Sequence, residues 1–224
     1  MHKIREILEE LRLVLSGRSG VIDAVLPPVV FILLNLLIGF DAAMWGALIL
    51  AVLLGIWRLT RHQPLTYAFG GVIGVLFAIL ISRWLNRSEG FFLPNILLGG
   101  ITVLLCFLSV VFGRPLVAWT SYLTRRWPLE WYWHPRVRPA YNEVTLVWGL
   151  FFSIRLSIQF GFFQQGALDS LVWVNLLTGW PATLVLLIVS YLYGSWRLAR
   201  LKGPSVVEFE QGADPPWSGQ SRGF

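Results

Sequence analysis

The stretch Tyr141–Gln165, YNEVTLVWGLFFSIRLSIQFGFFQQ, is an apolar run long enough to cross a bilayer. A bilayer core is about 30 Å thick, and a helix that rises about 1.5 Å per residue crosses it with about 20 residues. Arg155 lies well inside the run, about 21 Å along the helix axis from Tyr141. Because a charge at that depth costs at least about 2.5–3.5 kcal/mol on insertion scales, we expect Arg155 to have a polar partner or a watery cavity.

The composition is that of a membrane protein. Of 224 residues, 56% are hydrophobic and only 13% are charged, and the mean hydropathy is +0.65, whereas a soluble domain carries about 25% charged residues. The net charge of +6 gathers at alternate ends of the apolar runs, which is a topology signal rather than a phosphate-binding stripe. We therefore expect contacts with membrane lipids and no binding of nucleic acid.

The sequence predicts an all-α, polytopic membrane protein. Residues 1–20 place apolar side chains at helical spacing opposite charged ones, which is typical of an amphipathic interfacial helix. Residues 21–202 form one membrane domain, and residues 203–224 form a polar tail that alone would be disordered. The six predicted transmembrane helices cover residues 21–39, 42–60, 65–82, 92–112, 142–164 and 169–196.

The positions of Lys and Arg predict the topology. Cytoplasmic loops carry an excess of both residues, and only Arg83 and Arg87 fall on the other side if the N-terminus is cytoplasmic. We therefore expect a multi-pass membrane protein with both termini in the cytoplasm. Residues 113–140 are then the largest cytoplasmic link. Pro115 starts a short helix there, and the stretch WPLEWYWHPRVRP is too rich in proline for a continuous helix, so we expect an interfacial aromatic shelf.

Small residues at four-residue spacing predict where the helices pack closely. The fifth span carries such a seam of small residues, which includes Ser153 and Ser157. Arg155 lies about 200° around the helix from these two serines, so it faces away from the seam. The span therefore has two unlike faces, and we expect it to be central. The seams on the third and fifth spans contain Gly70, Gly74, Gly149, Ser153, Ser157 and Gly161.

Counting along the spans identifies partners for Arg155. Asn35 and Asn175 lie at a similar depth, about 20 Å from the inside edge, and Gln159 lies one turn along the same face. We expect Arg155, Asn35, Asn175 and Gln159 to form an intramembrane polar cluster. It is either a solute or anion site or a polar staple that holds the bundle together, and the sequence leaves both open.

Other chemistry-bearing patterns are sparse. Asp23 and Glu143 lie at inside ends of predicted spans, where they either pair or cap helix N-termini, and capping is the commoner role. There is no phosphate-binding glycine loop, no HExxH and no paired Cys-x-x-Cys. We expect no metal, no cofactor and no enzymatic activity.

One short motif occurs twice. Gly55–Arg61, GIWRLTR, and Gly194–Arg200, GSWRLAR, share Gly, Trp, Arg, Leu and Arg, and each closes a predicted span at its inside edge. The echo marks either a duplicated hairpin or the general recurrence of Trp and Arg at inside membrane edges.

Several stretches carry a resemblance to known families. At DAVLPP, RLTRHQPL, GFFLPNIL, GRPLVAW and TLVWGLFFSIRLSIQF the chain resembles an uncharacterised family of bacterial, largely actinobacterial, membrane proteins of unknown function. More distantly, residues 113–189 resemble the intracellular septation protein A (YciB) family through Arg114-Pro115-Leu116, Trp148–Phe152 and Trp173-Val174-Asn175. That resemblance implies a role in cell-envelope integrity and division without catalysis. The chain differs from the second family in its additional span, the arginine in span five and the longer cytoplasmic link.

Two functions follow from these observations. The first is a non-enzymatic inner-membrane scaffold or accessory subunit that works with other membrane proteins or with further copies of itself. The second is a small-solute or ion transporter or channel whose site surrounds Arg155. A water-accessible cavity at Arg155 favours transport, whereas a dry, hydrogen-bonded arginine favours the scaffold.

Overall fold

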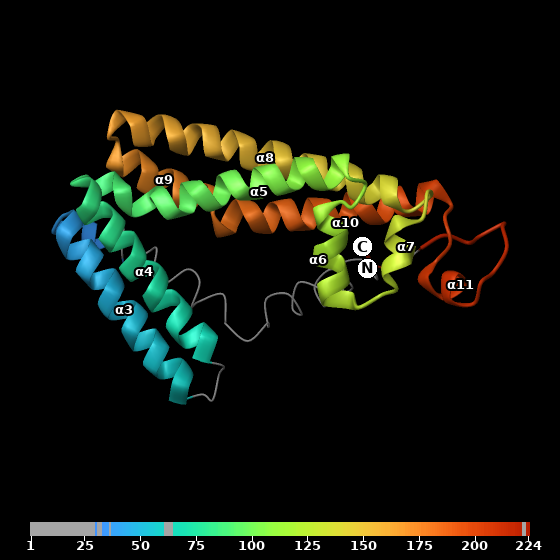
Figure 1. Ribbon diagram of the computed structural model, residues 1–224, viewed down its shortest axis with the longest axis horizontal. Coiled ribbons are helices and arrows are strands. Elements are labelled where there is room, and N and C mark those ends of the chain that lie inside the picture. The colour runs from blue at the N-terminus through green and yellow to red at the C-terminus, as the bar shows by residue number, and fades with distance from the viewer. Residues whose placement is uncertain (1–29, 31–32, 36, 61–64, 221–222) are drawn as a thin grey trace. The chain divides into compact units, whose positions relative to one another are not determined.

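The computed structural model describes residues 30, 33–35, 37–60, 65–220 and 223–224, with the side chains of 58 and 65–71 left out (Figure 1). This part of the chain is helical throughout and contains no β-strand. The predicted amphipathic helix at 1–20 lies outside the described residues, and of the predicted span 21–39 only residues 30, 33–35 and 37–39 are described.

The long helices fall where the apolar runs predict them. They are α3 (Phe40–Thr60), α4 (Leu65–Leu85), α5 (Leu93–Val111), α8 (Arg138–Gln165) and α10 (Trp180–Leu201). Within the described part, four segments are long and apolar enough to cross a membrane, and Val72–Leu85 is a shorter apolar helix. The four segments are Phe40–Trp57, Ser88–Val111, Arg138–Gln165 and Leu168–Leu201. The chain is therefore a polytopic membrane protein, and six spans remain a prediction.

The last apolar segment is broken, although 169–196 was predicted as one continuous span. It consists of α9 (Leu168–Thr178) and α10, which are separated at Gly179. Pro181 stands in the first turn of α10, where its missing N–H breaks no helical hydrogen bond and its ring clashes with no preceding carbonyl. Inside an unbroken helix, Pro181 would remove a helical hydrogen bond and its ring would clash with a preceding carbonyl. The chain therefore ends one helix and starts another.

The described residues divide into two compact units. The first contains those of residues 1–96 together with 159–182, and the second contains 97–158 together with 183–224. In the first unit α3 lies beside α4 (Figure 1), and the 3-10 helix η1 (Ser88–Phe92) contacts α4 and α9. Gly90 permits this contact, because a Cβ there would lie 2.9 Å from Cα of Ser82.

The second unit has an aromatic core. The helices α6 (Leu116–Arg125), α7 (Leu129–Trp133) and α11 (Val206–Glu210) pack around the first turns of α8 and the end of α10. Trp131, Tyr132 and Tyr141 are fully buried, and the indole N–H of Trp131 donates to the carbonyl of Pro204 at 2.8 Å. Trp131 and Tyr132 belong to the stretch predicted as an interfacial aromatic shelf, and both rings are buried in this core. The position of the link at a membrane surface stays a prediction. Prolines cut the link into short helices, and each helix turns its large rings inward.

The polar tail is folded against this core rather than left alone. Ser205 caps α11 in a capping box with Glu208, and the second Glu208 carboxylate oxygen accepts from the backbone N–H and the hydroxyl of Ser218 at 2.9 and 2.8 Å. The backbone N–H and the hydroxyl of Ser218 and of Ser205 all donate to this carboxylate, and these hydrogen bonds lower the pKa of Glu208 to about 2. Trp217 packs edge-on against His134. Burial of the His134 imidazole and the nearby positive charge of Arg136 lower the pKa of this histidine.

Candidate functional site

Three amide side chains meet within the first unit. Gln159 of α8 donates to Oδ1 of Asn175 on α9 at 2.9 Å, and Asn95 of α5 donates to the same oxygen. The amide nitrogen of Asn175 donates to the backbone carbonyl of Leu171 at 2.8 Å. Gln159 is only 2% exposed. The sequence predicted Gln159 beside Asn175 but did not predict Asn95 there, although an asparagine inside the apolar stretch GFFLPNIL was a visible signal.

This amide cluster (Asn95, Gln159 and Asn175) lies next to the break between α9 and α10. A Cβ on Gly179 would overlap the backbone carbonyl oxygen of Asn175, so the chain needs glycine there to turn so tightly. The hydroxyl of Thr178 donates a hydrogen bond to the backbone carbonyl of Val174 at 2.6 Å. The end of a helix leaves backbone carbonyls without intrahelical partners. The break therefore adds carbonyl acceptors to neutral amides, a combination suited to an uncharged polar solute or a cation.

Asn35 does not join these amides. Its side-chain N–H donates to Asp169 at 3.3 Å, near the start of α9. The predicted cluster is wrong in this member. Equal depth in the membrane does not bring two residues together, because depth says nothing of which helices pack side by side.

Arg155 stands on α8 one turn before Gln159 and belongs to the second unit. It is half-buried, and its Nε is buried without a hydrogen-bond partner among the described residues. The part of the chain that the structure describes thus leaves the partner expected for this side chain unidentified.

Among the described residues, the small-residue seam of α8 makes close contacts in one half only. A Cβ on Gly149 would lie 3.3 Å from Cβ of Cys106 and from the ring of Phe107, so α8 meets α5 there in the second unit. Ser153 donates to the carbonyl of Gly149 at 2.7 Å. Ser157 is exposed and a Cβ on Gly161 would meet nothing within 4 Å.

The small-residue seam of α4 stays a prediction. Among the described residues, nothing lies within 4 Å of a Cβ built on Gly74. Gly70 lies within α4, four residues before Gly74.

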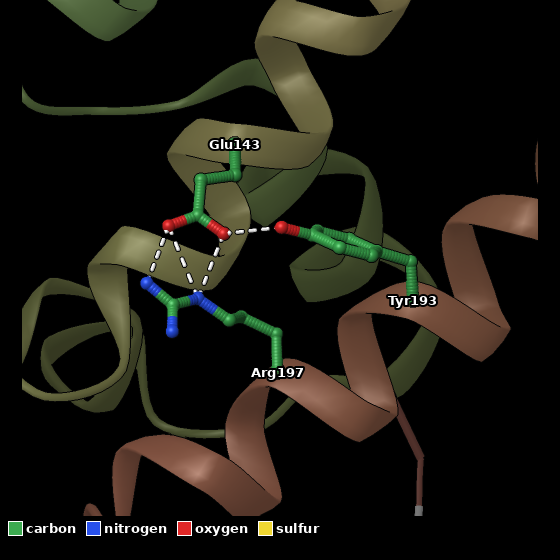
Figure 2. A network of polar contacts seen from close by, with 3 residues as sticks. All are labelled: Glu143, Tyr193 and Arg197. Carbon is green, nitrogen blue, oxygen red and sulfur yellow. Dashed lines mark hydrogen bonds and ion pairs between the residues drawn. The ribbon is translucent and has the colours of Figure 1, made fainter.

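Glu143 pairs with another helix instead of capping its own. It lies in the second turn of α8, and its carboxylate accepts from Arg197 of α10 at 2.8 Å on each oxygen (Figure 2). The hydroxyl of Tyr193 donates to the same carboxylate at 2.8 Å. The predicted helix-end role is therefore wrong, because α8 begins earlier, at Arg138. Asp23, the other predicted carboxylate, lies outside the described residues.

The two arginines of the predicted outer links are both matched by acids in the first unit. Arg83 lies 3.3 Å from Asp41, and Nε of Arg87 lies 3.6 Å from Glu89. Arg87 also covers the ring of Phe163 at 5.6 Å.

In the described residues no group of three or more His, Cys, Asp or Glu side chains could hold a metal ion. A family model described as "Protein of unknown function (DUF3159)" matches residues 15–198. No curated protein and no solved structure matches the chain.

Proposed function

The chain belongs to the DUF3159 family of proteins of unknown function, and we propose that it is a non-enzymatic inner-membrane scaffold or accessory subunit. The observation that carries this proposal is the folded aromatic module of the second unit, made of α6, α7, α11 and the tail. Its core joins the ends of two membrane-crossing helices, α8 and α10, to a surface that lies outside the apolar segments. A chain whose only task was to cross the bilayer would need no such module.

The module holds exposed arginines in fixed positions. Arg114 covers the ring of Trp133 at 4.5 Å, Arg136 that of Trp217 at 5.5 Å, and Arg200 that of Trp196 at 5.0 Å. An arginine that already lies on an aromatic ring loses less side-chain freedom when it binds an acidic group. This arrangement supports docking of an acidic surface of another membrane protein or of a further copy.

The proposed orientation puts this module in the cytoplasm, with both termini on the same side. Its support is the excess of Lys and Arg on that side, against only Arg83 and Arg87 on the other. A cysteine introduced in the tail at Ser218 and labelled by a membrane-impermeant reagent tests it. We expect the cysteine to be labelled only after the membrane is opened. Labelling of intact cells would show that the tail lies outside and that the proposed orientation is wrong.

Crosslinking in native membranes tests the scaffold role. We expect a defined crosslinked product that is lost when Arg114, Arg136 and Arg200 are together replaced by Gln. The matched control is Arg83→Gln, which removes a charge of the same type from the first unit and should leave the product intact. A product that survives the triple substitution, or a chain that crosslinks to no protein, contradicts the proposal.

A second function, passage of a small solute, is favoured by the amide cluster beside the broken helix. Broken helices with polar side chains at membrane depth form the substrate sites of many transporters. Flux measured in liposomes with the purified chain should fall when Asn175 or Gln159 is replaced by Leu. If the unchanged chain gives no more flux than empty liposomes, or if these variants carry as much flux as the unchanged chain, the cluster is only a packing staple.

A further inference from the structure

The end of the described chain is inserted into the aromatic core of the second unit. Phe224 is only 9% exposed, and its ring stacks on Tyr141 with centroids 4.4 Å apart and planes 10° apart. Arg125 donates from Nε to the carbonyl oxygen of Phe224 at 3.1 Å. The ring contact therefore holds the side chain of Phe224 in place, and the charge-assisted hydrogen bond holds its backbone.

Two glycines shape the pocket around this ring. Any Cβ on Gly194 would overlap the ring of Phe224, so the wall formed by α10 has room for an aromatic residue only because position 194 has no side chain. Gly223 has φ +79°, and a Cβ there would lie 2.7 Å from Nη1 of Arg125 and 2.9 Å from the ring of Trp127. The pocket thus selects a glycine followed by an aromatic residue.

The rest of the tail is held by separate contacts. Gln220 accepts from the backbone N–H of Val206 at 3.1 Å, and Ser218 donates to Glu208. These hydrogen bonds do not involve the Phe224 pocket. The last pair, Gly223–Phe224, therefore has polar contacts that are separate from the hydrogen bonds of α11.

We propose that this pocket is a recognition site for a glycine–aromatic segment of another polypeptide, which the chain fills with its own Gly223–Phe224. The contacts that recognise such a segment are the Tyr141 face, the Arg125 guanidinium and the open wall at Gly194. The chain's own tail competes with the incoming segment, so binding is weak until the tail is displaced. This site stands on its own contacts and does not depend on the scaffold role.

The full chain carrying Phe224→Ala tests the proposal, because it keeps the tail and empties the pocket. A fluorescently labelled peptide Ser-Arg-Gly-Phe should bind this variant at least about tenfold more tightly than Ser-Arg-Gly-Ala, a difference of about 1.4 kcal/mol. The unchanged chain should bind the Phe peptide more weakly than the variant does. Adding Gly194→Leu to the variant should abolish binding, because a leucine side chain would occupy the pocket.

Equal binding of the two peptides, or equal binding by the unchanged chain and Phe224→Ala, overturns the proposal. The proposal is also overturned if Phe224→Ala fails to bind the Phe peptide although its helical circular dichroism and elution volume match those of the unchanged chain. If Phe224→Ala does not fold, Phe224→Leu takes its place, since leucine fills part of the pocket but cannot stack on Tyr141. The Phe peptide should then bind Phe224→Leu more tightly than it binds the unchanged chain, and the absence of that difference also overturns the proposal.

Discussion

Glu143 on α8 and Arg197 on α10 form a two-point ion pair, with Nη2 and Nε of the arginine each 2.8 Å from a different carboxylate oxygen. This geometry fixes the relative rotation of the two helices, because a guanidinium and a carboxylate match in one plane only. Arg197 belongs to the repeated motif GSWRLAR. In this copy the motif therefore supplies a helix-to-helix contact as well as an aromatic–basic membrane edge.

Loss of one partner of this pair should cost more than loss of both. Glu143→Gln or Arg197→Gln leaves a charge without its partner at the edge of an apolar segment, whereas the double variant leaves none. We expect each single variant to unfold at a lower temperature in detergent than the double variant. Additive losses in a double-mutant cycle would show that the pair is not coupled.

Gly149 and Gly161 form a matched pair on one helix. Gly149→Leu should destabilise the chain by about 1–3 kcal/mol, because its side chain would be forced against Cys106 and Phe107. Gly161→Leu should change stability by less than about 0.5 kcal/mol, since nothing lies within 4 Å of its added Cβ. Unfolding in mixed micelles compares the two, and equal losses would contradict the contact between α5 and α8.

Gln159→Leu should weaken the first unit measurably. The substitution removes the hydrogen bond to Asn175 from a residue that is 2% exposed. Hydrogen bonds between membrane helices are worth about 0.6 kcal/mol on average and at most about 1.7 kcal/mol. We expect a loss in that range, measured by reversible unfolding. A neutral result would mean that the amides do not hold α8 and α9 together.

The tail should loosen in acid through Glu208. Its folded pKa of about 2 lies below the ordinary value of 4.5, so its stabilising contribution is present above pH 4.5 and is lost as pH falls towards 2. The protection of the Ser218 amide, measured as its hydrogen-exchange rate relative to an unstructured peptide at the same pH, should fall across this window. In Glu208→Gln exchange should be faster at neutral pH and should show no such window. An unchanged pH profile in that variant would assign the loosening to another group.

The sequence predicted elements better than contacts. Apolar length was sufficient to locate α3, α4, α5 and α8, since about 20 apolar residues in a row have few alternatives to a membrane helix. The break at Gly179 was missed because the segment stays apolar on both sides of it, although Pro181 was in view. The aromatic link was read as a membrane surface because tryptophan is common at such surfaces. Folded against the tail, Trp131 instead finds a carbonyl partner at Pro204.

The sequence by itself determined that this protein is helical, lies in a membrane and carries a charge at Arg155 within an apolar run. Those properties depend on composition and spacing along one dimension. Only the tertiary structure decided that Gln159 and Asn175 bond with Asn95 while Asn35 turns to Asp169, and that Phe224 stacks on Tyr141. The reason is physical: burial can be read from a run of residues, but a partner is chosen by direction and distance between side chains far apart in the chain.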